Sequence, residues 1–152
     1  MLENNERRYY TEGDINLPNY SWVEYEPNLH GNGMTTPNNN AMGRYMKIGN
    51  TVWWHVDVNF LGVALNSTNS MYITVPFPAA LHTDSASGAF HDVSSGKTYP
   101  LRGHYEQYER DLRLYHPNNQ GEDQAVAYNY PFGISTEDYF HICGWYEAVF
   151  ND

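Results

Sequence analysis

WWHVDVNF, residues 53–60, alternates apolar and polar side chains after an opening tryptophan pair. Because successive side chains of an extended chain point to opposite faces, this alternation predicts a β-strand with one buried face. The buried face is predicted to carry Trp54, Val56, Val58 and Phe60. The opposite face carries Trp53, His55, Asp57 and Asn59, and these side chains are left available to solvent or to a partner.

A second strand-like run, RYMKI at residues 44–48, precedes this stretch, and a Gly49-Asn50 pair separates the two runs. Glycine tolerates the positive φ that the first central residue of a type II′ turn requires. Residues 44–60 are therefore predicted to form a β-hairpin with Gly49 and Asn50 at its turn.

Short runs with the composition of β-strands recur along the chain, separated by clusters of Gly, Ser, Asn, Asp and Pro. They cover residues 20–25, 71–75, 99–103, 111–115, 125–130 and 139–149. No segment predicts a helix of three turns, so the pattern predicts an all-β fold, an antiparallel β-sandwich of jelly-roll-like type. Residues 1–20 are predicted to be an extended N-terminal arm, and residues 21–152 a single β-sandwich domain.

The length of the chain indicates a single domain, and its charge argues against nucleic-acid binding. Its 152 residues suit one domain with a core of its own. It carries 8 Lys and Arg against 18 Asp and Glu, a formal net charge of −10. Nucleic-acid phosphates would be repelled by this charge, so we expect no nucleic-acid binding.

The single cysteine, the first residues and the distribution of apolar residues argue against a disulfide-linked, a secreted and a membrane-inserted protein. Cys143 has no partner for an intramolecular disulfide or a multi-cysteine zinc site, and its aromatic-rich strand pattern predicts a buried thiol. The opening MLENNERRYY lacks the apolar region of a secretion signal. No run of about 18 apolar residues occurs, so no membrane insertion is expected.

Four groups of residues, spread over residues 21–148, together resemble a domain of tailed-bacteriophage virion proteins. They are Trp22, Tyr25 and Pro27; then Gly43, Arg44, Tyr45, Lys47, Ile48, Gly49, Asn50 and Val52; then Val75 and Pro76; then Gly144 and Tyr146. The resemblance implies a mostly-β, usually trimeric domain on a tail fibre, a receptor-binding tip or a head decoration. The chain has no heptads or collagen-like repeats that would form a fibre shaft, so a self-sufficient tail fibre is not expected.

His55 and Asp57 raise the question of a metal site. They stand about 7 Å apart on one strand face, close enough to contact one ion. The candidates for a third ligand are His104 and Glu106, which repeat the same spacing, and His141. We favour the reading without a metal or other cofactor, in which His55 and Asp57 form sideways hydrogen bonds on a solvent-facing or subunit-facing strand.

The absence of catalytic motifs argues against an enzyme, and the surplus of aromatic residues argues for a binding surface. The sequence has no lipase-type G-x-S-x-G, H-E-x-x-H, Walker or Rossmann motif, so we expect no enzyme. Aromatic side chains out of phase with the core, or interleaved with charges, are expected at a surface. The partner- or glycan-binding candidates are Trp53, His55, Asp57, Asn59, Tyr105, Tyr108 and Tyr115. A protein interface is favoured over sugar stacking because Trp and Tyr are enriched in interface hot spots.

Two functions follow from these expectations. The first is a non-enzymatic bacteriophage structural protein, a capsid decoration (cement) protein on the outer surface of the virion, assembled in the host cytoplasm. It would form a homotrimer and contact the major capsid protein or other virion proteins. The alternative is a tail-fibre or baseplate module that recognises host surface glycans.

Overall fold

The computed structural model describes residues 21–31, 34–35, 40–65 and 70–150. Within these ranges every regular element is a β-strand, and none is a helix. The strands are β1 (Val23–Tyr25), β2 (Leu29–His30), β3 (Met34–Thr35), β4 (Ala41–Ile48), β5 (Thr51–Asn59), β6 (Ala64–Leu65), β7 (Tyr72–Thr74), β8 (Thr83–Asp92), β9 (Lys97–Tyr105), β10 (Asp111–Pro117), β11 (Asp123–Ala125) and β12 (Tyr139–Glu147). The expected N-terminal arm, residues 1–20, lies outside the described ranges.

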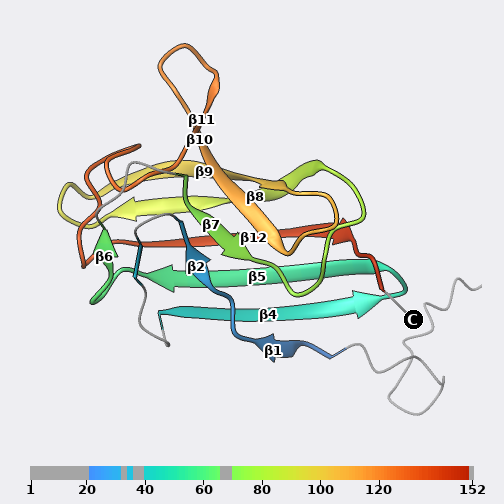
Figure 1. The fold of residues 1–152 in the computed structure, drawn as a ribbon. Coiled ribbons are helices and arrows are strands. Elements are labelled where there is room, and N and C mark those ends of the chain that lie inside the picture. The colour runs from blue at the N-terminus through green and yellow to red at the C-terminus, as the bar shows by residue number, and fades with distance from the viewer. Residues whose placement is uncertain (1–20, 32–33, 36–39, 66–69, 151–152) are drawn as a thin grey trace, which may run out of the picture.

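One antiparallel sheet forms most of the molecule. Its strands follow the order β1-β4-β5-β12-β8-β9-β10-β7-β2, with β11 paired to β10, and β3 and β6 form a separate pair. The sheet curls into a half-barrel, so that β2 and β7 cross in front of the layer that contains β4, β5 and β12 (Figure 1). The predicted all-β, antiparallel, sandwich-like class is therefore confirmed, and its two layers are the two halves of one curled sheet.

A single short segment supplies both edges of this sheet. β1 pairs with β4 at one edge and β2 pairs with β7 at the other, although the two strands are separated by only residues 26–28. Asn28 and Thr74 exchange hydrogen bonds, from Asn28 N to Thr74 Oγ1 at 2.7 Å and from Thr74 N to the Asn28 carbonyl at 3.0 Å. The Tyr25 hydroxyl donates to the Thr74 carbonyl at 3.2 Å. The segment thus covers the open side of the half-barrel.

The β4–β5 hairpin forms where the sequence predicts it. Ile48 pairs with Thr51, and Gly49 has a φ of 59°. Tyr108 is the only non-glycine residue with positive φ in the described ranges, so Asn50 does not share the positive φ of Gly49. A positive φ at the first central residue alone is the feature of a type II′ turn.

Alternation places the predicted apolar row of β5 in the core. Trp54, Val56, Val58 and Phe60 are at most 2% exposed, and Phe140, Ile142 and Tyr146 of β12 join them. The inward row of β9 ends at Tyr105, which is fully buried. Tyr105 is therefore not available as the partner- or glycan-binding ring that the sequence predicts.

The Tyr105 hydroxyl has a structural role in the core. It accepts a hydrogen bond from Trp54 Nε1 at 2.8 Å, and the two rings meet edge to face. It lies against Gly144, where an added Cβ would come within 2.7 Å of the hydroxyl oxygen. Burial raises the pKa of Tyr105, so the hydroxyl stays protonated. The bond satisfies the indole N–H, which would otherwise be buried without a partner.

Strand β8, the longest in the fold, is absent from the sequence prediction. Its residues TDSASGAFHD are mostly small or polar and have low strand propensity. They fit because β8 lies between β12 and β9, and at Gly88 an added Cβ would come within 1.9 Å of the His141 carbonyl oxygen. The predicted strand at residues 125–130 is instead the end of β11 followed by a turn in which Ala127 and Tyr130 exchange backbone hydrogen bonds.

Gly49→Ala is expected to lower the free energy of unfolding by about 1–2 kcal/mol, because a Cβ is unfavourable at positive φ. Chemical denaturation followed by fluorescence measures the change. The control is Gly133→Ala, since Gly133 lies in a loop without positive φ and has open space around it. Equal stability of the two variants would contradict the turn assignment.

Tyr105→Phe is expected to cost about 1–3 kcal/mol of unfolding free energy, because it leaves the Trp54 N–H buried and unpaired. Tyr139→Phe is the matched control, since Tyr139 is exposed and its ring stacking on His91 survives the change. Thermal unfolding distinguishes them: a melting temperature for Tyr105→Phe as high as that of the control would show that the buried hydrogen bond contributes little.

Candidate functional site

The solvent-facing side of β4, β5, β12 and β8, called here the outer face, carries the polar row predicted from the sequence. Trp53, His55, Asp57 and Asn59 all lie on it. The antiparallel register extends this row onto β12, where it pairs Trp53 with Trp145, His55 with Cys143, Asp57 with His141, and Asn59 with Tyr139. The outer face therefore combines two strands that lie far apart in the sequence.

One end of the outer face is apolar. Met46, Trp53 and Trp145 are direct neighbours across β4, β5 and β12. Trp22 lies at the sheet edge, where the Arg44 guanidinium, two residues before Met46 on β4, is 5.0 Å from its ring centroid. Trp22 is 47% exposed and Trp145 52% exposed. We call Trp22, Met46, Trp53 and Trp145 the aromatic patch.

Beyond the aromatic patch, the outer face carries a ladder of stacked rings. His55 stacks on His141 at 6.5 Å between ring centroids, His141 on His91 at 5.3 Å, and His91 on Tyr139 at 4.5 Å. His55 Nε2 donates to Asp57 Oδ2 at 2.9 Å, because an ionised carboxylate only accepts. The predicted sideways hydrogen bond between His55 and Asp57 is thus present, and we call His55, His91, Tyr139 and His141 the histidine ladder.

Of the three residues suggested as a third ligand beside His55 and Asp57, the structure places one next to them. His141 lies beside them, as the ladder shows. His104 and Glu106 do not, because β5 and β9 are separated by β12 and β8, which puts them about 14 Å apart at the usual strand spacing. No single ion can bridge that distance.

Cys143 is exposed on the outer face, whereas the sequence pattern predicts a buried thiol. The reason is the phase of β12: Phe140, Ile142 and Tyr146 point inward, so the alternate position 143 points outward. Its Sγ lies 3.8 Å from the Ser87 carbonyl oxygen of the neighbouring strand. The thiol therefore contributes to the surface and not to the core.

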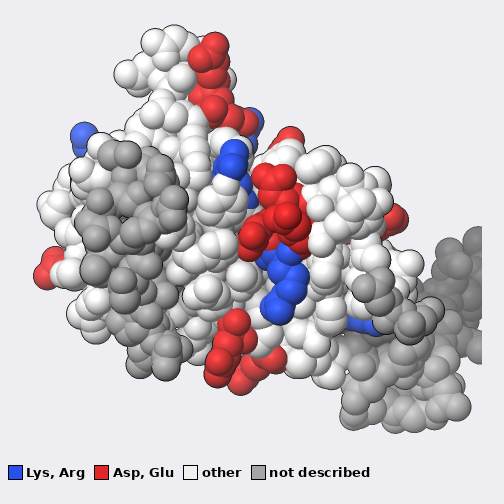
Figure 2. All heavy atoms as spheres, in the orientation of Figure 1, with Lys and Arg blue, Asp and Glu red and all other residues white. Residues whose placement is uncertain are grey.

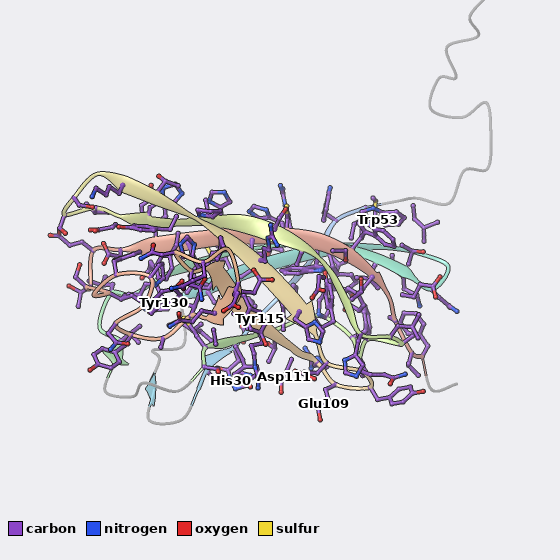
Figure 3. The ribbon with its side chains drawn as sticks, turned by 90° about the horizontal axis from the view of Figure 1, so that it is seen from above. His30, Trp53, Glu109, Asp111, Tyr115 and Tyr130 are labelled. Carbon is purple, nitrogen blue, oxygen red and sulfur yellow. The ribbon has the colours of Figure 1, made fainter. Side chains whose placement is uncertain are left out.

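The remaining aromatic candidates lie away from the aromatic patch. Tyr108 is 68% exposed in the turn between β9 and β10, where it adopts a φ of 63°. Tyr115 is half-buried on β10, and Arg113 Nη1 donates to its hydroxyl at 3.3 Å. Figure 3 shows Trp53 on the opposite side of the molecule from His30 and Asp111. The seven candidates therefore do not form one surface.

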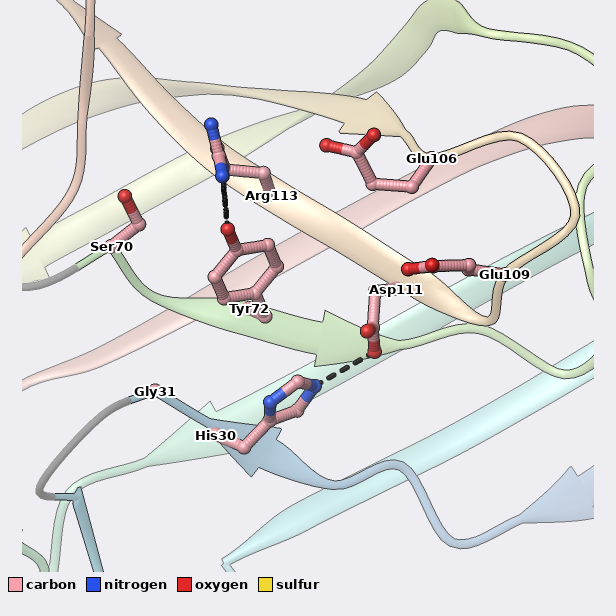
Figure 4. A pocket seen from close by; sticks show the side chains of 8 residues that line it. All are labelled: His30, Gly31, Ser70, Tyr72, Glu106, Glu109, Asp111 and Arg113. Atoms are coloured by element: carbon pink, nitrogen blue, oxygen red, sulfur yellow. Dashed lines mark hydrogen bonds and ion pairs between the residues drawn. The ribbon is translucent and has the colours of Figure 1, made fainter.

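An acidic groove lies on the opposite side of the molecule, lined by Glu106 and Glu109 of the turn between β9 and β10, by Asp111 of β10, and by further residues on or beside β2, β7 and β10 (Figure 4). Figure 2 shows acidic side chains gathered near the middle of that face. His30 Nε2 donates to Asp111 Oδ1 at 2.8 Å. This pair could not be predicted from the sequence: the alternation of β10 is readable, but His30 comes from a strand 81 residues away.

Two further groups near the groove bear on its chemistry. Arg113 donates to the hydroxyls of Tyr115 and Tyr72, and these hydrogen bonds raise the pKa of Arg113 and keep it charged. Beside the groove, His82, His104 and Glu106 are the described residues whose side chains come close enough to share a metal ion. From the sequence, only His104 and Glu106 could be recognised as a pair, by their spacing.

Comparison with known proteins finds no matching family model, no matching curated protein and no matching solved structure. No helix in the described part of the chain is long and apolar enough to cross a membrane. The role of the chain is therefore inferred from its own surfaces.

Replacing His55 and Asp57 together by alanine is expected to change the free energy of unfolding by less than about 1 kcal/mol, because the two form a solvent-exposed hydrogen-bonded pair. Val56→Asp, between them on the inward face, is expected to prevent folding by burying an unpaired carboxylate. Circular dichroism and denaturation measure both. A double variant as damaged as Val56→Asp would mean that the row is buried in an assembly.

Proposed function

We propose that the chain is a non-enzymatic structural protein of a tailed-bacteriophage virion, a capsid decoration protein that forms a homotrimer. It attaches to the outer head shell through the major capsid protein or neighbouring virion proteins. The observation that carries this proposal is the aromatic patch, in which Trp53 lies opposite the half-exposed Trp145 on the paired strands β5 and β12. The hairpin with the sequence GRYMKIGNTV, which resembles the phage domain, forms part of the same surface.

The size of the aromatic patch suits the centre of a protein interface. Fully buried Trp side chains cover about 150–250 Å² each, so Trp22 and Trp145 at half exposure leave roughly 200 Å² to be covered. A stable interface buries about 800 Å² per partner, so the aromatic patch would be its core and the neighbouring polar side chains its rim. The histidine ladder supplies such a rim. Trp is also the residue type most enriched in interface hot spots.

We assign the aromatic patch to the contact between copies of the chain. A cyclic trimer has heterologous contacts, so the patch of one copy packs on a different surface of the next. The acidic groove lies on the other side of the molecule and is not part of the aromatic patch (Figure 3). Several weak attachments in one trimer then add up to firm binding on the shell.

One observation favours the second candidate, a module that recognises host surface glycans. A groove beside Trp22 is lined by Glu24, Arg44, His55 and Asp57, so that charged and hydrogen-bonding groups lie next to an exposed ring. Such a combination suits a polar ring-shaped ligand. A glycan array separates the candidates: the decoration protein gives no hit and binds emptied capsids at a fixed stoichiometry, whereas the glycan module does the reverse.

The full chain is expected to sediment as a trimer, and Trp53→Ala combined with Trp145→Ala is expected to weaken the trimer at least tenfold. Sedimentation equilibrium measures both. Leu61→Ala is the control, because Leu61 is 69% exposed but lies past the opposite end of β5. A monomeric wild type, or an equal loss in the control, would argue against the assigned contact.

A further inference from the structure

His82, His104 and Glu106 converge beside the acidic groove from two different parts of the chain. His82 immediately precedes β8, while His104 and Glu106 lie at the end of β9. The two imidazole rings stack with centroids 5.4 Å apart and an interplanar angle of 16°. His82 Nδ1 lies 3.9 Å from Glu106 Oε2, and one ligand atom of each of the three residues lies within 4.8 Å of the others.

Hydrogen bonds fix the tautomers of both imidazoles. His104 Nδ1 lies 2.6 Å from Asp84 Oδ1, and His82 Nδ1 lies 3.2 Å from the Tyr105 carbonyl oxygen. A carbonyl and an ionised carboxylate only accept, so in both rings Nδ1 carries the donated proton and Nε2 keeps its lone pair. Metal-bound histidines have this arrangement, with the second N–H donated to a carboxylate or a backbone carbonyl.

We propose that His82, His104 and Glu106 bind a divalent transition-metal ion, Zn²⁺, with Asp84 orienting His104. Two imidazole nitrogens and one carboxylate oxygen form a ligand set that zinc accepts, and three protein ligands leave its fourth position open. Zinc bonds of about 2.0–2.1 Å place tetrahedral ligands roughly 3.4 Å apart. The His82 atom nearest to Glu106 is the protonated Nδ1, so the His82 ring must turn to present Nε2 and the three groups must close by on the order of 1 Å. The His82 side chain is 55% exposed and precedes its strand, which leaves it free to make this movement.

The surroundings favour a cation at this position. Asp84 and Glu106 are part of the proposed site, Glu109 lies nearby in the groove, and the whole chain carries a net charge of −10. The histidine ladder and the neighbouring Asp57 are not equivalent, because no three of their ligand atoms come within the same distance of one another. In the described part of the chain no other three His, Cys, Asp or Glu side chains bring ligand atoms this close.

Zinc bound here would form a metal-dependent cross-link within the chain, separate from the aromatic patch. It would tie the segment before β8 to the end of β9, next to the exposed turn in which Tyr108 holds a positive φ. All three ligands belong to one chain, so binding needs neither the trimer nor a virion partner. The open fourth position is then available to water or to a donor atom of a partner.

The test is zinc titration of the full chain after removal of metals with a chelator. Isothermal titration calorimetry is expected to show saturable binding of about one Zn²⁺ per chain, and zinc is expected to raise the melting temperature because it binds the native state. His82→Ala and Glu106→Gln are expected to weaken binding at least tenfold, since each removes a ligand. Asp84→Asn is expected to weaken it about 10–100-fold through the orientation of His104.

The control is the double variant His55→Ala with His141→Ala, which removes two histidines from the ladder and leaves the proposed ligands intact. It is expected to bind zinc as the wild type does. Loss of binding in this control, unchanged binding in His82→Ala, or no saturable binding by the wild type would each overturn the proposal. Tighter binding of Ca²⁺ than of Zn²⁺ would overturn the assignment of the ion. His82 is exposed, so its variant is expected to fold and keep the test decisive.

Discussion

The register between β5 and β12 is the constraint on which both faces of the sheet depend. It sets Trp53 opposite Trp145 and Asp57 opposite His141, while Trp54 stays inside to reach Tyr105. Side chains alternate with a period of two, so a slip of one residue would bury imidazoles and carboxylates and expose the core. The aromatic patch, the histidine ladder and the buried hydrogen bond are therefore consequences of one pairing.

Local features of the fold could be predicted from the sequence, and features that depend on distant strands could not. The alternation of residues 53–60 and the turn at Gly49 are local, and both predictions are confirmed. Strand β8 is small and polar, and its place follows only from its neighbours β12 and β9. Tyr105 is surrounded by charges in the sequence, yet its partner Trp54, 51 residues away, holds it in the core.

The candidate sites follow the same division. The alternation correctly places His55 and Asp57 on the solvent-facing side of β5, but it carries no information about His141 on β12 or about the exposure of Cys143. The repeated spacing identifies His104 and Glu106 as a pair. Their neighbour His82 approaches from before β8, so only the pairing of β8 with β9 could reveal it.

The position of β12 in the sheet affects how the chain folds during synthesis. This strand is the last in sequence order among those described, yet it lies between β5 and β8 and pairs with both. Before β12 is synthesised, the β4–β5 hairpin and the β8–β9–β10 meander are connected only through the β1–β2 segment at their far edges, so β5 and β8 each have an unpaired edge open to other chains. The sheet can close between β5 and β8 only after β12 has been synthesised, and slow or high-level synthesis would expose these edges to aggregation until then.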